Sequence, residues 1–561
     1  MSELCENQVL SQLYADFIVE FGGNAEVLVD RYQTECVTVF NTHLAMIHLP
    51  VDSMENVAMF AYNSVPKVYG LMDSTNMDIS GITRVHNQPY LSLRGANILV
   101  GLIDTGIDYT HPVFRYADGT TRIAAIWDQT INNGLPPRYT DYGTEYTSED
   151  INRALASEQP ETIVPSKDTN GHGTFMAGIA AGNIDPSSDF AGAAPESVIA
   201  AVKLKEAKDY LREYYVIPDG ISAYQETDIM MGIRYLVDKA IQLQKSLVIY
   251  IGVGTNSGGH DGSSYLGQYM NDVGDLRSVC IVAPCGNEGN RGTHYYGQIT
   301  ENGAYEDVEI RVDNGEAGFV VELWGKAPDI LSVGIVSPGG ERVEKIKPRY
   351  NLVQTIDFLL EPTEIFVMFE LVESSSGNPV IVMRFRNPSP GIWTIRVYGE
   401  NILYKDYHMW LPIGDFIEEG TYFLKPDPNM TVTEPGNTNL CIATTAYNHY
   451  SSSIYVQSGR GFTFDGRVVP DIAAPGVNIY GPVPGGGFTR KSGTSAAAAH
   501  TAGAAALLLE WGIYRRNNLN MDTTEVKKLM TRGARRRPGI LYPSRIWGFG
   551  ELDLYNVFVL D

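Results

Sequence analysis

The sequence predicts an α/β protein: a parallel sheet with helices on both faces, preceded by an N-terminal α+β unit and interrupted by an all-β segment. Strand-like and helix-like patterns alternate from about residue 96 to residue 284, which is typical of a doubly wound sheet. Between residues 302 and 427, short strand-like segments follow one another with little helix between them. The α/β texture returns at residue 439, so we expect one discontinuous domain on either side of the β segment.

The first 74 residues are expected to form a unit of their own. Residues 14–19 and 65–71 have strand patterns, residues 22–33 and 51–60 have helix patterns, and residues 36–48 alternate as a single long strand would. This order of strands and helices predicts a small α+β domain.

The strongest strand signal of the α/β part is the apolar run at residues 96–103. It ends at Asp104, which suits a buried parallel strand that delivers a side chain at its carboxyl end. The two parts, residues 75–301 and 428–561, are expected to fold together. Further strands are predicted at residues 198–204, 247–251, 279–284, 440–444 and 471–480, and helices at residues 228–244 and 495–510.

Residues 302–427 are expected to form an inserted β-sandwich or jelly roll. Turn signals such as Pro338-Gly339-Gly340 separate strand patterns at residues 317–324, 330–336, 365–371, 379–385 and 393–397. The residues expected to face its interior are Val321, Leu323, Val333, Phe366, Met383 and Ile395.

Charge and composition exclude several function classes. The chain has 42 Lys and Arg against 66 Asp and Glu, and its net charge of −24 repels nucleic acids and anionic membranes. No run reaches the roughly 18 apolar residues of a membrane span. The acidic N-terminus lacks the basic and apolar regions of a Sec signal peptide, so we expect cytoplasmic synthesis. Five unevenly spaced cysteines favour reduced thiols over a disulfide framework.

Three short motifs carry side chains suited to catalysis. Asp104 ends an apolar strand before a tight turn, His172 stands between two glycines before a small-residue helix, and Ser495 opens an Ala-rich helix. Taken singly, the aspartate has an alternative role as a turn cap and the serine as a helix N-cap, and Gly-His-Gly is only moderately specific. Taken together, the order Asp, His, Ser is one of the known arrangements of a nucleophilic triad.

With these motifs in this order, the sequence resembles the subtilisin-like serine proteases. The resemblance extends from about residue 95 to residue 561, without the β segment, and implies a subtilisin-like sheet. The matching motifs are Ile103-Asp104-Thr105-Gly106, Gly171-His172-Gly173-Thr174, Gly493-Thr494-Ser495, Pro284-Cys285-Gly286-Asn287-Glu288-Gly289 and Pro470-Asp471-Ile472-Ala473-Ala474-Pro475-Gly476-Val477.

The resemblance implies a role for each catalytic residue. Ser495 would be the nucleophile, His172 the base that takes its proton, and Asp104 the carboxylate that orients the imidazole. The side chain of Asn287 and the backbone N–H of Ser495 would donate hydrogen bonds to the oxyanion, where loss of one donor costs roughly 3 to 4 kcal/mol of barrier.

The substrate is expected as an extended strand beside Gly252, Val253 and Gly254, which in the family form one wall of the specificity pocket. This chemistry requires no cofactor. We identify no metal ligands in the sequence, which leaves undecided whether the protein binds a structural calcium ion. The implied partners are a protein or peptide substrate and the chain's own cleaved prodomain.

Two positions depart from the common family pattern. Ala496 follows the nucleophile where most members have Met, and Ala499 precedes His500 where most have Pro. Neither position carries a proton, so the mechanism is expected to stand. Asp108, His111 and His500 belong to the matched motifs but are interpreted as structural.

The absent signal peptide, the long segment from residue 122 to residue 168 and the β insert are similar to the clostridial Csp proteases of spore germination. Residues 14–71 resemble the prodomains of the subtilisin-like family, which assist folding, are cut by the enzyme itself and then inhibit it. We therefore expect residues 1–74 to be a prodomain that is cut between Leu71 and Ser80, with an unrelated N-terminal domain as the alternative. The Csp resemblance implies that this prodomain stays bound after cleavage. It also implies a jelly-roll insert, an association with the spore, and a zymogen of a spore-cortex hydrolase as substrate.

Two alternatives remain open. One is a processing subtilase with an unrelated substrate. The other is a catalytically silent pseudoprotease that binds partners through the jelly roll, since some Csp relatives have lost triad residues. This chain keeps all three, which disfavours the second alternative.

Overall fold

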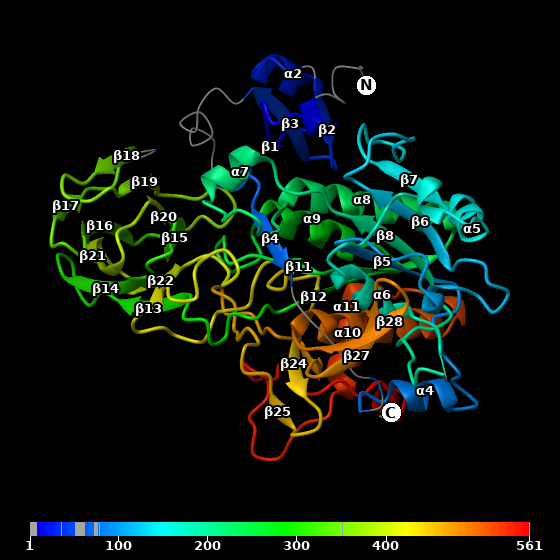
Figure 1. Ribbon diagram of the computed structural model, residues 1–561. Helices are drawn as coiled ribbons and strands as arrows, with labels where there is room; N and C mark the ends of the chain where they lie inside the picture. Colours follow the sequence, from blue (N-terminus) through cyan, green and yellow to red (C-terminus); the bar gives the residue numbers. More distant parts are fainter. Residues whose placement is uncertain are drawn as a thin grey trace.

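The structure is a computed structural model that describes residues 8–34, 36–50, 62–71, 77, 79–185, 187–349 and 352–559. Figure 1 shows a central sheet with helices on both sides, an N-terminal unit above it and a group of β-strands beside it. Within the described residues, no helix has the length and apolar character needed to cross a membrane.

The central sheet has nine strands in the order β25-β24-β12-β10-β5-β8-β6-β7, with β26 also paired to β24. Neighbouring strands pair parallel except β7 and β25, which pair antiparallel at the two edges. The strands are β5 (Ile98–Asp104), β6 (Ile123–Asp128), β7 (Thr144–Thr147), β8 (Val198–Lys203), β10 (Ser246–Ile251), β12 (Val279–Pro284), β24 (Ile442–Asn448), β25 (Ser453–Ile454) and β26 (Ile472–Pro475).

Successive residues of a strand point to opposite faces, and the two faces of this sheet are covered by different helices. Leu99 and Ile103 of β5 belong to the buried cluster that contains α8 and α9, whereas Val100 and Leu102 belong to the cluster with α6 and α10. The predicted arrangement with helices on both faces is confirmed. The helices are α4 (Ile82–Asn87), α5 (Ser148–Leu155), α6 (His172–Ala181), α7 (Asp209–Tyr214), α8 (Glu226–Leu243), α9 (Tyr265–Gly274), α10 (Thr494–Leu509), α11 (Thr523–Gly533) and α12 (Leu554–Val557).

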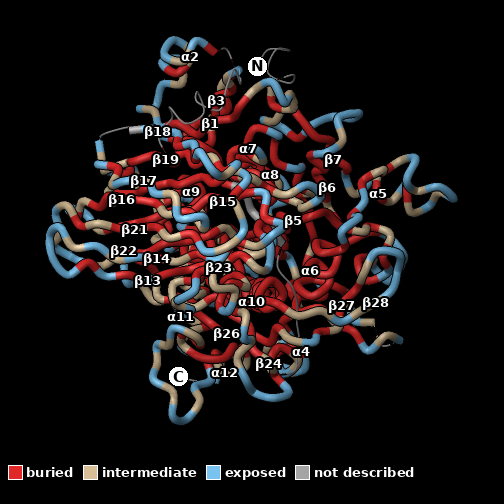
Figure 2. The backbone as a smooth tube through the Cα atoms, turned by 60° about the vertical axis from the view of Figure 1, so that its left-hand side comes forward, coloured by how far each residue is buried: buried red, intermediate tan, exposed pale blue. Residues whose placement is uncertain are grey.

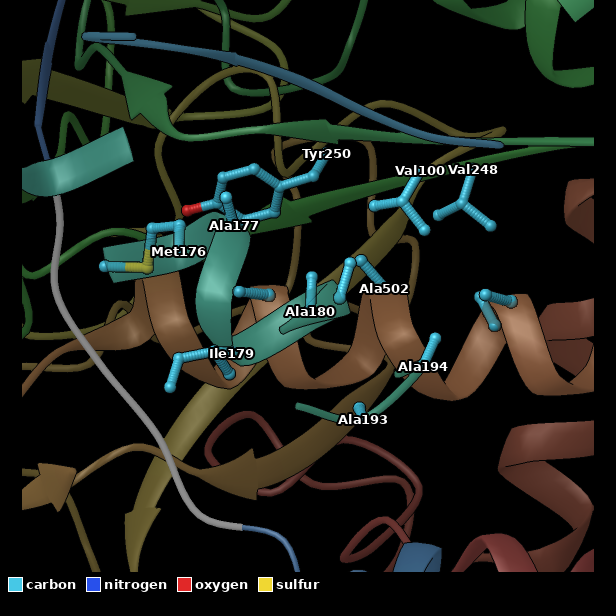
Figure 3. Close-up of a cluster of buried hydrophobic side chains, with 14 of the residues drawn as sticks. Val100, Met176, Ala177, Ile179, Ala180, Ala193, Ala194, Val248, Tyr250 and Ala502 are labelled. Carbon is cyan, nitrogen blue, oxygen red and sulfur yellow. The ribbon is translucent and has the colours of Figure 1, made fainter. Parts of the chain in front are cut away.

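Helices α6 and α10 are completely buried and pack against each other through small residues (Figure 3). A Cβ atom added to Gly503 would lie 2.3 Å from the Cβ of Ala193 and 2.6 Å from the carbonyl oxygen of Ala180. Only glycine allows this close approach. His172 begins α6 and Ser495 lies in the first turn of α10. The packing of these two helices therefore fixes the position of His172 relative to Ser495.

The β-strands from residue 294 to residue 423 form two further sheets, which we call the β unit. Their orders are β13-β22-β15-β20-β19-β18 and β17-β16-β21-β14-β23. β13 joins the first sheet although it precedes residue 302, where the β segment was expected to begin. The strands are β13 (His294–Gln298), β14 (Tyr305–Val312), β15 (Gly318–Gly325), β16 (Ile330–Val336), β17 (Arg342–Ile346), β18 (Leu352–Asp357), β19 (Glu364–Glu370), β20 (Val380–Arg386), β21 (Gly391–Asn401), β22 (Asp406–Trp410) and β23 (Tyr422–Phe423).

A single apolar cluster, drawn from both sheets, forms the core of the β unit, and Figure 2 shows buried backbone along these strands. Of the six residues expected to face inward, five belong to this cluster: Val321, Leu323, Val333, Met383 and Ile395. The prediction for Phe366 is wrong. Its neighbours Ile365 and Val367 point into the core, so alternation turns Phe366 to the other face, where it packs in a cluster with α7 and the N-terminal unit.

The N-terminal unit contains a three-stranded antiparallel sheet in the order β1-β3-β2, with β1 (Tyr14–Glu20), β2 (Val37–Val39), β3 (Leu44–Pro50) and helix α2 (Glu26–Tyr32). The single strand expected at residues 36–48 is a hairpin instead. The side chain of Asn41 accepts hydrogen bonds from the backbone N–H groups of His43 and Leu44, which stabilises a turn there. The helix expected at residues 51–60 lies outside the described residues.

The cysteines behave differently from one another. Cys36 forms a disulfide bond, which corrects the expectation of reduced thiols for that residue. Cys280, Cys285 and Cys441 are free and buried.

Short elements complete the chain around the central sheet. β4 (Val68–Leu71) lies between β9 (Tyr224–Gln225) and β11 (Val253–Gly254) in a small antiparallel sheet. Figure 1 labels β4 next to β11. β27 (Ile479–Val483) and β28 (Gly487–Lys491) form a hairpin, and η1 (Tyr62–Ser64) is a single 3-10 turn.

Candidate active site

Asp104 and His172 meet at the carboxyl end of the central sheet. The Nδ1 atom of His172 is 2.8 Å from Oδ1 and 2.9 Å from Oδ2 of Asp104, and both side chains are buried. The backbone N–H of Thr105 also donates to Oδ1, at 2.7 Å. A carboxylate in this position selects the tautomer with a proton on Nδ1, which leaves Nε2 as the proton acceptor.

Ser495 is the second residue of α10 and is fully buried. Its hydroxyl oxygen has no hydrogen-bond partner in the described part of the chain, so no hydrogen bond joins it to His172 there. Buried hydroxyl groups without a partner are uncommon in folded proteins. The contact between a catalytic serine and its base is often long when no substrate is bound.

Asn287 lies just beyond β12 and contacts the residue before Ser495. Its Oδ1 atom accepts hydrogen bonds from the backbone N–H and the hydroxyl of Thr494, both at 3.2 Å. With the oxygen assigned to Thr494, the Nδ2 group of Asn287 remains as a donor. Asn287 and His172 line the same pocket, together with Lys491.

The strand edge expected to bind substrate is paired with residues of the chain itself. Val253 is paired with Leu71, and Gly254 with Gly70, in antiparallel register. Gly252 has an additional role that the sequence did not reveal: a Cβ atom there would lie 1.9 Å from Oδ2 of Asp104. The absent side chain of Gly252 therefore makes room for the Asp104 carboxylate.

Comparison with known proteins identifies this arrangement. The subtilase family matches residues 95–344 and 419–550, more than half of the chain. The chain belongs to the subtilase family of serine proteases. The solved structure of the CspB protease of Clostridium perfringens is similar, with a TM-score of 0.77 and 32% identity, covering 86% of this chain and 96% of that one.

Among curated subtilases, thermitase of Thermoactinomyces vulgaris is 25% identical over 201 residues, which cover 36% of this chain and 51% of thermitase. Subtilisin of Bacillus sp. (strain TA39) is 24% identical over 281 residues, which cover 49% of this chain and 55% of subtilisin. The chain thus spans about half the length of these curated relatives.

The subtilase site contains a carboxylate that the motifs did not single out. Asp168 accepts hydrogen bonds from the hydroxyl of Thr105 at 2.8 Å and from the backbone N–H of Gly171 at 2.8 Å through Oδ1. Through Oδ2 it accepts from the backbone N–H and hydroxyl of Thr174, at 2.8 and 2.7 Å. It thereby joins the segment after Asp104 to the first turn of α6. The only signal in the sequence is its position four residues before His172.

The other polar residues of the matched motifs contact loops. Asp108 accepts from the backbone N–H of Gly485 at 2.8 Å, and His111 Nε2 lies 3.0 Å from the carbonyl oxygen of Gly487. His500 Nε2 is 2.5 Å from the hydroxyl of Ser80. Among the described residues, no group of three or more His, Cys, Asp or Glu side chains could hold a metal ion.

Proposed function

We propose that the chain is a serine endopeptidase in which Ser495 attacks the peptide carbonyl, His172 takes and returns the proton, and Asp104 orients His172. The observation that carries the proposal is the contact of both Asp104 carboxylate oxygens with Nδ1 of His172. This contact stabilises the imidazolium that forms when Nε2 takes the Ser495 proton. No cofactor takes part in these steps.

The tetrahedral intermediate places negative charge on the former carbonyl oxygen. In our proposal, Nδ2 of Asn287 and the backbone N–H of Ser495 donate to that oxygen. The hydrogen bonds between Asn287 Oδ1 and Thr494 support this role, because they hold the amide beside the first turn of α10. Backbone N–H groups at a helix N-terminus favour negative charge.

The N-terminal unit is proposed to be a prodomain that inhibits after cleavage. Support comes from β4, which occupies the edge at Val253 and Gly254 where a substrate strand is expected. We place the cut between Leu71, the last residue paired at that edge, and Ser80, whose hydroxyl is hydrogen-bonded to His500. The β unit is proposed to be the jelly-roll insert of this branch.

For the physiological role, we propose limited proteolysis of a protein zymogen, with the precursor of a spore-cortex hydrolase as the first candidate. The similarity to the CspB protease of Clostridium perfringens, at 32% identity over 86% of this chain, supports this choice.

A fluorophosphonate probe tests the catalytic proposal. Wild-type protein should label, and Ser495→Ala should not. Ser492→Ala is the matched control, because its hydroxyl instead accepts a hydrogen bond from the backbone N–H of Asn478. Absence of both labelling and self-cleavage in folded wild-type protein would instead support a pseudoprotease, because a bound inhibitory prodomain blocks labelling but does not prevent self-cleavage.

A further inference from the structure

Lys67, immediately before β4, is a fully buried lysine with an exposed fraction of 0%. Residues 1–71 contain only one other Lys or Arg, Arg31, which is exposed on α2. The carbonyl oxygen of Lys67 accepts from the backbone N–H of Glu226 at 2.8 Å, and its own N–H donates to Oε2 of Glu226 at 3.1 Å. Lys67 therefore extends the strand pairing of β4 with β9 by one residue.

Four buried carboxyl groups act on the Lys67 ammonium electrostatically, although none of the four forms an ion pair with Nζ within 4.0 Å. Glu226 begins α8 and Glu434 precedes β24, whereas Glu322 and Glu373 belong to the β unit. Burial on its own would lower the pKa of Lys67, but these four groups outweigh burial and raise it. The ammonium stays charged although it is removed from water.

Within this site, residues of the N-terminal unit connect Lys67 to the β unit. Nζ of Lys67 donates to Oδ1 of Asn63 at 3.0 Å, and Nδ2 of Asn63 donates to Oε1 of Glu373 at 2.7 Å. Nζ also lies 5.2 Å from the ring centre of Tyr62, whose hydroxyl donates to Oε2 of Glu322 at 2.6 Å.

Glu434 is the carboxyl group with the fewest partners. Among the described residues, no donor reaches either of its oxygens with hydrogen-bond geometry, although the Ser264 hydroxyl lies close enough to lower the pKa of Glu434. Burial raises its pKa to about 7, and Lys67 is the largest influence in the opposite direction. Its backbone pairs with Thr255, the residue after β11, so this carboxyl group belongs to the same edge that holds β4.

Departure of residues 62–71 would leave these carboxyl groups without their cation, and a strand that takes the place of β4 would bury them again. An uncompensated buried charge typically costs several kcal/mol, so any strand that replaces β4 binds more tightly if it carries an ammonium or guanidinium group at the same position. Tyr62 and Asn63 would leave with the segment, which makes space for a longer side chain.

We propose that Glu226, Glu322, Glu373 and Glu434 form a subsite for a lysine or arginine side chain of the substrate. The basic residue would stand where Lys67 stands, four residues before the residue paired with Val253. The inference rests on the proposed function, since it requires a substrate strand to replace β4. Lys67 then occupies, within the chain itself, the position that the basic side chain of the substrate would take.

The first experiment does not depend on catalysis. In the uncleaved Ser495→Ala chain, hydrogen exchange of residues 62–71 is compared for Lys67→Met, Lys67→Arg and the control Arg31→Met. Lys67→Met should exchange at least about tenfold faster, because loss of 1.4 kcal/mol is a factor of ten. Arg31→Met should retain protection, and Lys67→Arg, which keeps the cation, should exchange more slowly than Lys67→Met. Unchanged protection in Lys67→Met would overturn the cation site.

The second experiment tests substrate selection in the active chain. Peptides with the sequence of residues 62–80 are made with Lys, Arg or Met at position 67, and with Ser64→Ala as a control. The Lys and Arg peptides should have kcat/KM values at least about tenfold above the Met peptide. Glu434→Gln should narrow that difference.

The outcomes separate the two proposals. Equal kcat/KM values for the Lys and Met peptides would overturn the substrate subsite while leaving the protease intact. A chain that neither cleaves itself, labels with fluorophosphonate nor cleaves any peptide would refute the proposed function, whereas the exchange experiment would still report on the cation site.

Discussion

Asp16 of the N-terminal unit and Lys208, the N-cap residue of α7, form a buried ion pair with Nζ 2.7 Å from Oδ1. Nδ1 of His48 lies 2.6 Å from the same oxygen, and Nε2 of Gln225 donates to Oδ2 at 2.7 Å. Burial opposes ionisation of Asp16, but Lys208 and His48 outweigh it and hold its pKa below the ordinary value. The N-terminal unit is therefore attached to the segment around α7 through the Asp16–Lys208 ion pair as well as through apolar packing.

Replacing Asp16 by Asn should loosen that attachment, because it leaves Lys208 buried and uncompensated. Breaking a buried ion pair in this way costs about 3 to 5 kcal/mol. The readout is hydrogen exchange of β1 in the Ser495→Ala chain. Asp30→Asn, at an exposed site on α2, is the control. Equal exchange in both variants would mean that the apolar packing alone holds the unit.

Substitutions in the proposed catalytic group should reduce turnover without unfolding the chain. Ser495→Ala should abolish hydrolysis, and Asp104→Ala and His172→Ala should each cost orders of magnitude in kcat. Asn287→Ala should cost about 10²- to 10³-fold, the usual effect of removing one oxyanion donor. Circular dichroism checks the fold. Wild-type turnover in Ser495→Ala would end the serine-protease assignment.

Asp168→Asn tests a positioning residue. The amide has only one acceptor oxygen, so it can accept from the backbone N–H of Gly171 or of Thr174 but not from both, and the start of α6 and His172 should shift. We expect kcat to fall about 10- to 100-fold with KM nearly unchanged, because small misplacements of a catalytic base are costly. A purely structural role would lower thermal stability but leave the kcat of the folded fraction and its pH profile unchanged.

Glu288, next to Asn287, should make stability depend on pH. Burial raises its pKa to about 7, with Arg291 opposing that shift. The folded state then holds a proton that the unfolded state releases above its ordinary pKa near about 4.5, so stability falls as pH rises from about 4.5 to 7. The loss approaches about 3 kcal/mol, at 1.36 kcal/mol per pKa unit.

Glu288→Gln removes this titration and keeps the shape of the side chain. Chemical denaturation at several pH values should show a smaller decline between pH 5 and 7 in the variant than in the wild type. If the free energy of unfolding fell equally with pH in the wild type and in Glu288→Gln, Glu288 would not retain its proton in the folded protein.

Self-cleavage should divide the wild-type chain into a small N-terminal and a large C-terminal fragment on a denaturing gel. Mass spectrometry should find the new terminus between Leu71 and Ser80, and Ser495→Ala should stay intact. The reaction is intramolecular, so dilution should not slow it. A full-length wild-type chain that is active on peptides would contradict this scheme.

Sequence reasoning located the strands that carry the site because their signals are local. The apolar run before Asp104 and the small-residue helices after His172 and Ser495 are visible without tertiary information. The strand predicted at residues 96–103 corresponds to β5 within two residues at its start and one at its end.

The features that were missed depend on contacts between distant segments. Asp168 accepts hydrogen bonds from backbone N–H groups, such as that of Gly171, that face it only in the folded chain. Gly252 follows another strand, and its lack of a side chain makes room for the Asp104 carboxylate. Alternation continued through the turn at Asn41, which concealed a hairpin. For Phe366 the β pattern was right, but both faces of β19 are apolar, so periodicity alone did not show which face turns inward.

The central sheet has one consequence for synthesis on the ribosome. β12 and β24 are parallel neighbours, with Val282 paired with Ile442, yet the whole β unit lies between them in the chain. Until β24 has been translated, β12 is an apolar strand with an unpaired edge, a surface prone to association between nascent chains. Early closure of β13 onto β22 would shorten the loop that separates the two strands and so shorten the time for which that edge is exposed.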